Sequence, residues 1–172
     1  QLSKGGYASG PVSFMRGADA SAGTIKSGGK TRRAAKMVVL DVAHPDIEEF
    51  IWCKAKEERK ARVLEQAGYD MSLDSPDWAS IQYQNANNSV RVTDAFMEAV
   101  VDGKEWGLTA RTDGSVVETT DARALLKSIA QAAWESGDPG VIFLDSVERA
   151  NPTPALGSLE ATNPCGELPL LA

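Results

Sequence analysis

Cysteine and histidine are both scarce in this sequence, which has 2 cysteines and 1 histidine among its 172 residues. Cys53 and Cys165 lie far apart along the chain, so they do not form the framework of a disulfide-stapled domain. Together with His44 they also fall short of the four ligands that a structural zinc site uses. The sequence therefore predicts no disulfide scaffold and no metal ligands.

Long apolar runs are absent as well. No run approaches the roughly 20 residues that a membrane-spanning helix needs, and the N-terminus lacks the charged and apolar regions of a signal peptide. A net charge of -6 argues against broad binding to nucleic acid or to anionic membranes. We therefore expect a cytoplasmic protein with no membrane partner and no nucleic-acid partner.

What the chain does have is enough apolar sequence to form a core. Its hydrophobic content is 42%, its mean hydropathy is -0.25, and its 172 residues are enough for one ordinary domain. The sequence opens at Gln1 rather than at a methionine, and it stops at Ala172, soon after its most informative motif. We expect it to be a piece of a longer protein.

Strand and helix patterns alternate along the chain. The apolar runs 37–42 and 140–145 suit strands buried on both faces, as in a parallel sheet, and 89–92 is typical of a further strand. Helices are expected to begin at four places: near Pro11, after Asp46, at Thr93 as a cap, and at Thr119 or Thr120. This alternation predicts an α/β fold with a mainly parallel sheet.

Two local patterns refine this prediction. The last of these helices carries the clearest apolar stripe, formed by Ala122, Leu125, Leu126, Ile129, Ala133 and Trp134. The segment from Leu108 to Val117, centred on Asp113-Gly114, fits a small hairpin with a type I′ turn.

The most informative stretch is Asn163-Pro-Cys-Gly-Glu167, where three reactive side chains occur at alternate positions. In an extended backbone, residues i, i+2 and i+4 project from the same side, so the amide, thiol and carboxylate can converge on one small ligand. A helix would turn Cys165 away from the other two. Pro164 favours extended dihedrals for Asn163, and Gly166 lets a ligand approach closely. We expect an extended segment suited to holding a hydroxyl and removing its proton beside a sulfur.

This pattern resembles the finger-loop motif of ribonucleotide reductases, and the wording Asn-Pro-Cys-Gly-Glu is similar to the adenosylcobalamin-dependent class II branch. Five further stretches resemble the catalytic-barrel sequence of that family in its usual order: Gly10–Arg16, Gly28–Met37, Leu40–Ile51, Asn87–Val92 and Asn151–Pro154. The resemblance covers essentially all 172 residues. It implies that residues 1–172 are part of a ten-stranded α/β barrel that holds the finger loop inside, with the rest of the barrel in the missing flanks.

The resemblance also implies a role for each residue of the motif. Cys165, as a thiyl radical, would remove the 3′-hydrogen of a ribonucleotide and later return it, because S–H and activated C–H bonds are similar in strength. Glu167 would act as general base on the 3′-hydroxyl, and Asn163 would position the ribose by hydrogen bonding. The alternative for Cys165 is a buried loop cysteine that packs as a small hydrophobic residue.

No residue of the chain can generate a radical unaided, so a cofactor must carry out the one-electron step. The resemblance implies adenosylcobalamin, and an adenosylcobalamin-dependent ribonucleoside-diphosphate reductase with a thioredoxin-like reductant. The choice between diphosphate and triphosphate substrates is left open, as is a homodimer. The reducing cysteine pair is expected to flank this chain, so we expect the 172 residues alone to be inactive.

Two other functions stay open. One is the large subunit of a class I reductase, which would receive its radical from a second subunit. The other is a non-catalytic nucleotide-binding module in which the cysteine is structural. Dependence of activity on adenosylcobalamin or on a second subunit would separate the two reductase classes.

Residues 27–36 concentrate basic side chains in a glycine-rich loop, which can bind phosphate through those side chains and through backbone N–H groups. A Walker A motif is excluded, because its first glycine would have to stand where Thr24 is found. By resemblance, the loop lies between the substrate and an allosteric deoxynucleotide effector. The residues expected to contact nucleotide are Gly28, Gly29, Lys30, Arg32 and Arg33, and the alternative is a solvated basic turn.

The remaining polar candidates have ordinary structural interpretations. Cys53 lies within a predicted helix and is expected in the core or at an interface, and His44 is expected to shape a turn. Asn85, Asn87 and Asn88 could line the mouth of the barrel, although such residues are more often found in turns and at strand edges.

Overall fold

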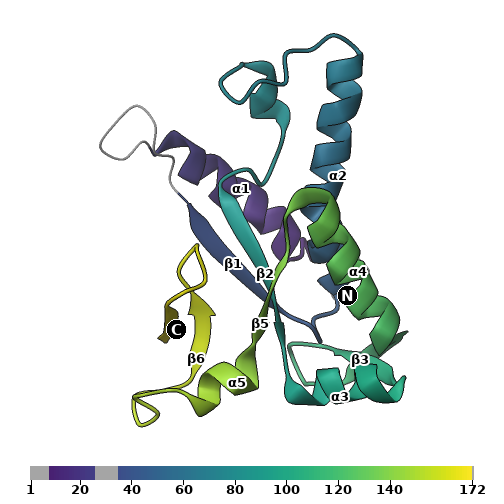
Figure 1. The fold of residues 1–172 in the computed structure, drawn as a ribbon, viewed down its shortest axis with the longest axis vertical. Helices are drawn as coiled ribbons and strands as arrows, with labels where there is room; N and C mark the ends of the chain where they lie inside the picture. The colour runs from purple at the N-terminus through teal and green to yellow at the C-terminus, as the bar shows by residue number, and fades with distance from the viewer. Residues whose placement is uncertain (1–7, 26–34, 172) are drawn as a thin grey trace.

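The central element of the structure is a three-stranded parallel sheet (Figure 1). The computed structural model describes residues 8–25 and 35–171, and the sheet within them has the order β1 (Lys36–Asp41), β2 (Ala86–Val92) and β5 (Gly140–Phe143). Both pairs of strands, β1 with β2 and β2 with β5, are parallel. Parallel neighbours need long crossover connections, and helices occupy them here. The predicted α/β fold with a parallel sheet is confirmed.

In the described part of the chain the helices are α1 (Pro11–Thr24), α2 (Ile47–Gln66), η1 (Asp77–Ser80), α3 (Asp94–Asp102), α4 (Ala122–Ser136) and α5 (Leu144–Arg149). Thr93 caps α3 as predicted, since its hydroxyl oxygen accepts a backbone N–H at 3.2 Å. The cap of α4 is Asp121, whose carboxylate accepts a backbone N–H at 2.7 Å. The predicted start at Thr119 or Thr120 is therefore wrong. Both threonines lie in a strand, which β-branched side chains favour.

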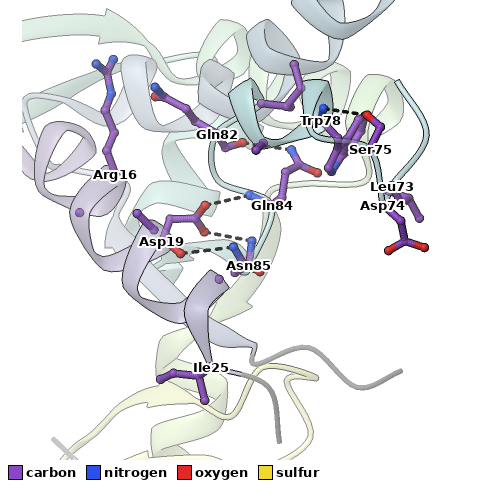
Figure 2. A pocket seen from close by; sticks show the side chains of 15 residues that line it. Arg16, Asp19, Ile25, Leu73, Asp74, Ser75, Trp78, Gln82, Gln84 and Asn85 are labelled. Atoms are coloured by element: carbon purple, nitrogen blue, oxygen red, sulfur yellow. Dashed lines mark hydrogen bonds between the residues drawn. The ribbon is translucent and has the colours of Figure 1, made fainter. Parts of the chain in front are cut away.

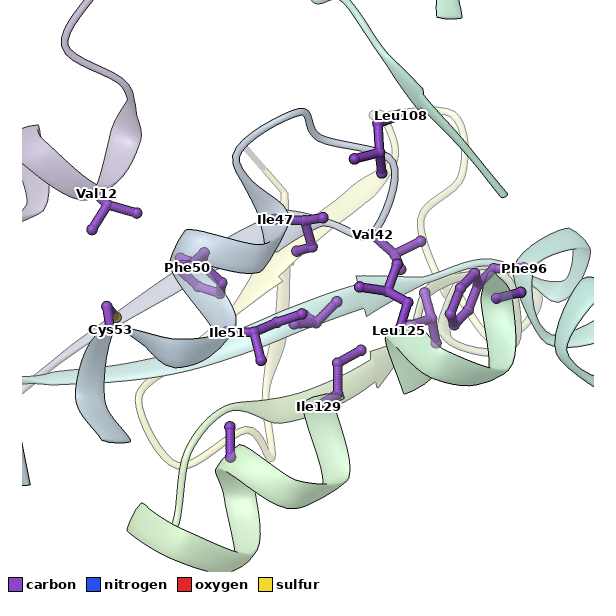
Figure 3. Packing of buried hydrophobic residues seen from close by; sticks show 14 of the residues in the cluster. Val12, Val42, Ile47, Phe50, Ile51, Cys53, Phe96, Leu108, Leu125 and Ile129 are labelled. Carbon is purple, nitrogen blue, oxygen red and sulfur yellow. The ribbon is translucent and has the colours of Figure 1, made fainter. Parts of the chain in front are cut away.

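Helices α2 and α4 pack together over one face of the sheet and enclose the core with it (Figure 3). The large side chains buried there include Ile47, Phe50, Ile51, Val90, Val92, Phe96, Leu125 and Ile129. Side chains of a strand alternate between its two faces. Val90 and Val92 of β2 therefore point toward the helices, whereas Asn87 and Arg91 lie on the opposite face.

The apolar stripe predicted on α4 is confirmed except at its C-terminal end. Leu125 and Ile129 are buried, but the side chain of Trp134 is 87% exposed. At about 100° per residue, position 134 is turned roughly 140° away from position 129. Ala132, three residues after Ile129, occupies the buried position instead.

Two antiparallel hairpins accompany the parallel sheet: β3 (Glu105–Thr109) with β4 (Val116–Asp121), and β6 (Leu159–Thr162) with β7 (Pro169–Leu171). The first was predicted, but its type I′ turn is wrong. Residues 110–115 connect the strands, and Gly114 has a positive φ while Asp113 does not. The Asp113 carboxylate accepts the Ser115 N–H at 3.0 Å, which stabilises this wider loop.

Phe96 offers a test of the core. It is 0% exposed and meets Trp106 edge to face, with ring centroids 5.2 Å apart. We expect Phe96→Ala to lower the free energy of opening of α3 by about 3–5 kcal/mol, because truncation leaves a cavity. Hydrogen exchange of a peptide covering 94–102 in the intact protein measures this. Val101→Ala is the matched control, since Val101 lies on the same helix and is 72% exposed; equal exchange in both variants would contradict the packing described.

Candidate functional site

The reactive motif lies at the tip of the β6–β7 hairpin. We call residues 159–171, with both strands and the loop between them, the cysteine hairpin. The predicted extended segment is wrong, because the chain turns at this point. The Gly166 N–H donates to the Asn163 carbonyl at 3.0 Å, and Gly166 has a φ of 83°. The motif is therefore a β-turn and not an alternating strand.

The sequence did contain a signal for this turn. A type I turn favours Asn at its first position, Pro at the second and Gly at the fourth, which matches Asn163, Pro164 and Gly166. Cys165 then occupies the third position, and its φ is not positive, so a type II turn does not apply. Pro164 favours an extended backbone at Asn163. This preference does not distinguish a strand from a turn, because the first residue of many turns is also extended.

Asn163 closes the cysteine hairpin. Its backbone N–H donates to the Leu168 carbonyl at 3.2 Å, and its side-chain Oδ1 accepts the Leu168 N–H at 2.9 Å. The amide oxygen is thus used within the loop. The side-chain NH₂ group makes no hydrogen bond to another residue in the described part of the chain, so it is the half of the amide that can meet a ligand.

Cys165 and Glu167 are both exposed at this tip, and Cys165 is a free thiol. The alternative of a buried cysteine that packs as a small hydrophobic residue is therefore wrong. Asn163, Cys165 and Glu167 all lie in the loop 163–168 between β6 and β7. A nucleophilic or radical sulfur, a carboxylate and an amide NH₂ can all act from such a loop on a ligand placed over it.

An open cleft of about 970 Å³ adjoins the tip of the cysteine hairpin. It lies between the hairpin and β5 with α5, and its lining includes Phe143, Val147, Leu159, Gly166 and Leu168. The cleft is mostly apolar. Gly166, the residue after Cys165, lines this cleft, which is large enough for a ligand.

Cys53 is confirmed as a core residue. It is 5% exposed, and its Sγ accepts a hydrogen bond from Asn88 Nδ2 at 3.3 Å. Burial raises the pKa of the Cys53 thiol to about 11, so it is protonated at neutral pH. A protonated, enclosed thiol is a poor nucleophile.

His44 shapes a turn, as predicted. Its Nδ1 accepts the Asp46 N–H at 3.0 Å just before α2 begins. Burial lowers the pKa of the His44 imidazole below its ordinary value, which favours the neutral form that accepts this bond.

The asparagines before and within β2 each bond to another part of the chain. Asn85 donates through both its backbone N–H and its Nδ2 to Asp19. Asn88 is 2% exposed and contacts Cys53. Asn87 Nδ2 donates to the carbonyl oxygen of Pro164, in the motif loop, at 2.6 Å. Sequence reasoning weighed these residues as ligands or turn formers, and it missed the contact between Asn87 and the loop.

A second cleft, of about 760 Å³, lies between α1 and residues 73–85 (Figure 2). Several of its polar groups are engaged within the chain. The Asp19 carboxylate accepts the Gln84 N–H at 3.1 Å and the Asn85 N–H at 2.9 Å, and Arg16 Nε donates to the Tyr83 hydroxyl at 3.0 Å. The basic loop expected to contact nucleotide, with Gly28, Gly29, Lys30, Arg32 and Arg33, lies outside the described residues.

The parallel α/β sheet agrees with the fold that the family resemblance implies, part of a reductase barrel. A family model described as "Ribonucleotide reductase, barrel domain" matches residues 1–172. The chain therefore belongs to the ribonucleotide reductase family, as its motifs predicted.

Three relatives are similar to the chain over nearly all of its length. It is 61% identical to "Vitamin B12-dependent ribonucleotide reductase" of Streptomyces coelicolor over 96% of this chain and 17% of the relative. Identity is 48% to the protein of the same name from Rhodopirellula baltica, over 97% of this chain and 16% of the relative. Identity is 44% to "Vitamin B12-dependent ribonucleoside-diphosphate reductase" of Mycobacterium tuberculosis, over 98% of this chain and 21% of the relative. The chain thus spans about a fifth or less of the length of these relatives.

Their names agree with the adenosylcobalamin-dependent branch suggested by the motif wording. Among the described residues, none of the helices combines the length and the apolar character needed to cross a membrane.

The two cysteines should differ sharply in reactivity. In the native protein at pH 8, we expect iodoacetamide to modify Cys165 at least about 100 times faster than Cys53, because Cys53 is buried and its thiol has a pKa of about 11. Mass spectrometry of the peptides that carry each cysteine measures the ratio. Unfolding in urea is the control and should bring the two rates together. Comparable rates in the native state would contradict the assigned burial.

Proposed function

We propose that the protein to which this chain belongs, taken at the full length of its relatives, reduces ribonucleotides to deoxyribonucleotides. The observation that carries the proposal is the exposed Cys165 at the tip of the cysteine hairpin, where the next residue, Gly166, lines an open cleft. Membership of the ribonucleotide reductase family supports it. We call this longer polypeptide the parent protein.

The chemistry is divided among the three residues of the turn. Cys165, as a thiyl, takes the hydrogen atom from the ribose 3′-carbon, so that an S–H bond forms and the radical moves to the sugar. Glu167 takes the proton of the 3′-hydroxyl, which eases loss of the 2′-hydroxyl as water. The Asn163 NH₂ group holds the ribose. A thiol pair elsewhere in the parent protein supplies two electrons and two protons as it becomes a disulfide. One proton leaves with the 2′-hydroxyl as water, and a hydrogen takes its place at the 2′-carbon. Glu167 then returns its proton to the 3′-oxygen, and Cys165 returns its hydrogen atom to the 3′-carbon and becomes a thiyl again.

Adenosylcobalamin is the cofactor that we propose, and the described residues are compatible with it. This group holds its cobalt within its own ring, and grouped side chains suited to a metal ion are not found in the described residues. What the protein must offer is an approach to the sulfur, which the exposed Cys165 provides. When bound, the group would supply the one-electron oxidation of the thiol. The names of the relatives support this choice over radical delivery from a second subunit.

The substrate, the effectors, the reductant and the oligomeric state are also part of the proposal. The name of the Mycobacterium tuberculosis relative supports a ribonucleoside diphosphate substrate. Deoxynucleotide effectors would bind near the basic loop, where Lys30, Arg32 and Arg33 supply positive charge and Gly28 and Gly29 expose backbone N–H groups. A thioredoxin-like protein would renew the reducing thiols in the cytoplasm, and a homodimer is compatible with the same chemistry.

Replacing Cys165 tests the proposal directly. In the parent protein, we expect Cys165→Ser to abolish turnover, because an O–H bond is too strong to exchange hydrogen with the sugar, while nucleotide binding changes by less than about twofold. Reductase assays and equilibrium binding of the nucleotide measure the two effects. Cys53→Ala is the control and should keep most of the activity. Substantial turnover by Cys165→Ser would refute the role of Cys165 and favour a non-catalytic nucleotide-binding module.

Replacing Glu167 tests the proton transfer. We expect Glu167→Gln to lower kcat by about 10²–10⁴-fold, the usual contribution of a general base, with little change in substrate affinity. Glu118→Gln, an exposed carboxylate on β4, is the matched control. A variant that retains the kcat of the unmodified protein would rule out Glu167 as the base.

A further inference from the structure

The cysteine hairpin lies over the face of the sheet that the helices leave uncovered. It consists of two short strands, and a two-stranded hairpin is marginally stable by itself. Its position relative to the sheet must therefore come from contacts outside the hairpin. Two side chains of the central strand β2 make such contacts, and both reach main-chain oxygens of the cysteine hairpin.

The first contact is next to the reactive sulfur. Asn87 Nδ2 donates to the Pro164 carbonyl oxygen at 2.6 Å, and Pro164 is bonded directly to Cys165. This carbonyl is not the acceptor of the turn hydrogen bond, which is the carbonyl of Asn163. Asn87 therefore fixes a peptide group that the turn itself leaves unpaired.

The second contact lies four residues further along β2. Arg91 Nη1 donates to the Glu160 carbonyl at 3.0 Å, and its guanidinium lies 3.6 Å from the Glu160 carboxylate. Arg91 is itself held by Asp41 of β1 through two hydrogen bonds of 2.7 and 2.9 Å. Burial alone would raise the pKa of the Asp41 carboxyl, but the hydrogen bonds and charge of Arg91 outweigh it and hold the pKa below its usual value. The pair is therefore ionised at neutral pH.

The two contacts match in spacing. Asn87 and Arg91 lie on one face of β2, four residues apart, or about 13 Å along an extended strand. Their acceptors, Pro164 and Glu160, are also four residues apart and run in the opposite direction. Two attachment points fix the orientation of the cysteine hairpin as well as its position, whereas one would leave a pivot. Both side chains belong to β2, the middle strand of the sheet. This strand cannot shift without breaking the β1–β2 and β2–β5 pairing.

We propose that Asn87 is a positioning residue for the reaction at Cys165. Together with Arg91 it holds the cysteine hairpin against β2, and it acts on the sulfur through the Pro164 peptide. This inference rests on the proposed function, because it concerns where the sulfur lies relative to the sugar. A displacement of about 1 Å at a reacting atom can cost about 10²-fold in rate.

Asn87→Ala in the parent protein with its cofactor tests this inference. We expect kcat to fall about 10–100-fold, while the Kd for the nucleotide, measured without cofactor, changes by less than about twofold. Hydrogen exchange should become faster in peptides from 159–171 and stay unchanged in peptides from α4. Gln84→Ala is the matched control, because the Gln84 amide lies just before β2 and donates to the nearby Gln82 carbonyl rather than to the cysteine hairpin.

Asn87→Asp is the second variant, in case the alanine variant folds poorly. It keeps the shape of the side chain but replaces the NH₂ donor with an oxygen that repels the Pro164 carbonyl, so the same loss of kcat is expected. The inference is overturned if both variants keep kcat within about twofold of the unmodified protein. It is also overturned if kcat falls only together with faster exchange throughout the chain, which is the signature of general destabilisation.

The exchange measurement separates this inference from the proposed function. If the unmodified parent protein does not reduce ribonucleotides, the proposed function fails, whatever Asn87 does. Faster exchange confined to 159–171 in Asn87→Ala would then still support the attachment of the cysteine hairpin to β2. Unchanged exchange in that segment would overturn the attachment as well.

Discussion

The arrangement of this chain depends on the two faces of its central strand. Along β2, Val90 and Val92 are 0% exposed and pack beneath the helices, while Asn87 and Arg91 point to the other side. Strand alternation makes these two sets inseparable, because a shift of one residue would exchange them. Burial of the valines therefore also fixes where the polar side chains lie. The same hydrophobic core that stabilises the sheet thus places the groups that meet the cysteine hairpin.

The two cysteines show how the environment decides chemistry. Cys53 and Cys165 carry the same side chain, but Cys53 is enclosed by α2 and β2, and burial raises the pKa of its thiol. Cys165 stands at a turn, where the side chain is exposed and the backbone bends away from it. A thiol that must exchange hydrogen with a substrate needs contact with that substrate. Only the second environment allows such contact in this structure.

Much of the fold followed from local pattern, and the failures have physical causes. The positions of β1, β2 and β5, the Thr93 cap and the buried positions of α4 up to Ile129 depend on residues near one another in sequence. The expectation that 37–42 and 140–145 are strands buried on both faces is wrong, because β1 is half-buried, β5 is mostly exposed and 144–145 begin α5. The turn at the motif was mistaken for an extended strand, although Asn163 and Pro164 occupy positions that a type I turn favours. In this motif the alternation of polar side chains favours a strand, whereas Asn, Pro and Gly favour a turn, and the turn preferences decide the backbone.

The contact between Asn87 and Pro164 could not be predicted in the same way. The two residues are 77 positions apart, and no local preference connects them. Their meeting depends on how α5 and the following loop direct β6 across the sheet, and on the register that results. Pattern reasoning identified both segments but gave no means of placing one against the other. Tertiary packing alone decides which of the polar side chains on β2 reaches the loop.

The turn also explains how a reactive thiol can be presented without destabilising its own loop. A buried backbone group without a partner costs about 1–3 kcal/mol, so a loop that enters a cavity must pair its polar groups first. Here the Asn163 carbonyl accepts the Gly166 N–H, the Asn163 amide oxygen accepts the Leu168 N–H, and Asn87 donates to Pro164. In an extended strand, these groups would have to form their hydrogen bonds with a neighbouring strand. Because the turn and Asn87 pair these groups within the protein, a ligand could cover the tip and exclude water without leaving them unpaired, which the function proposed for Cys165 requires.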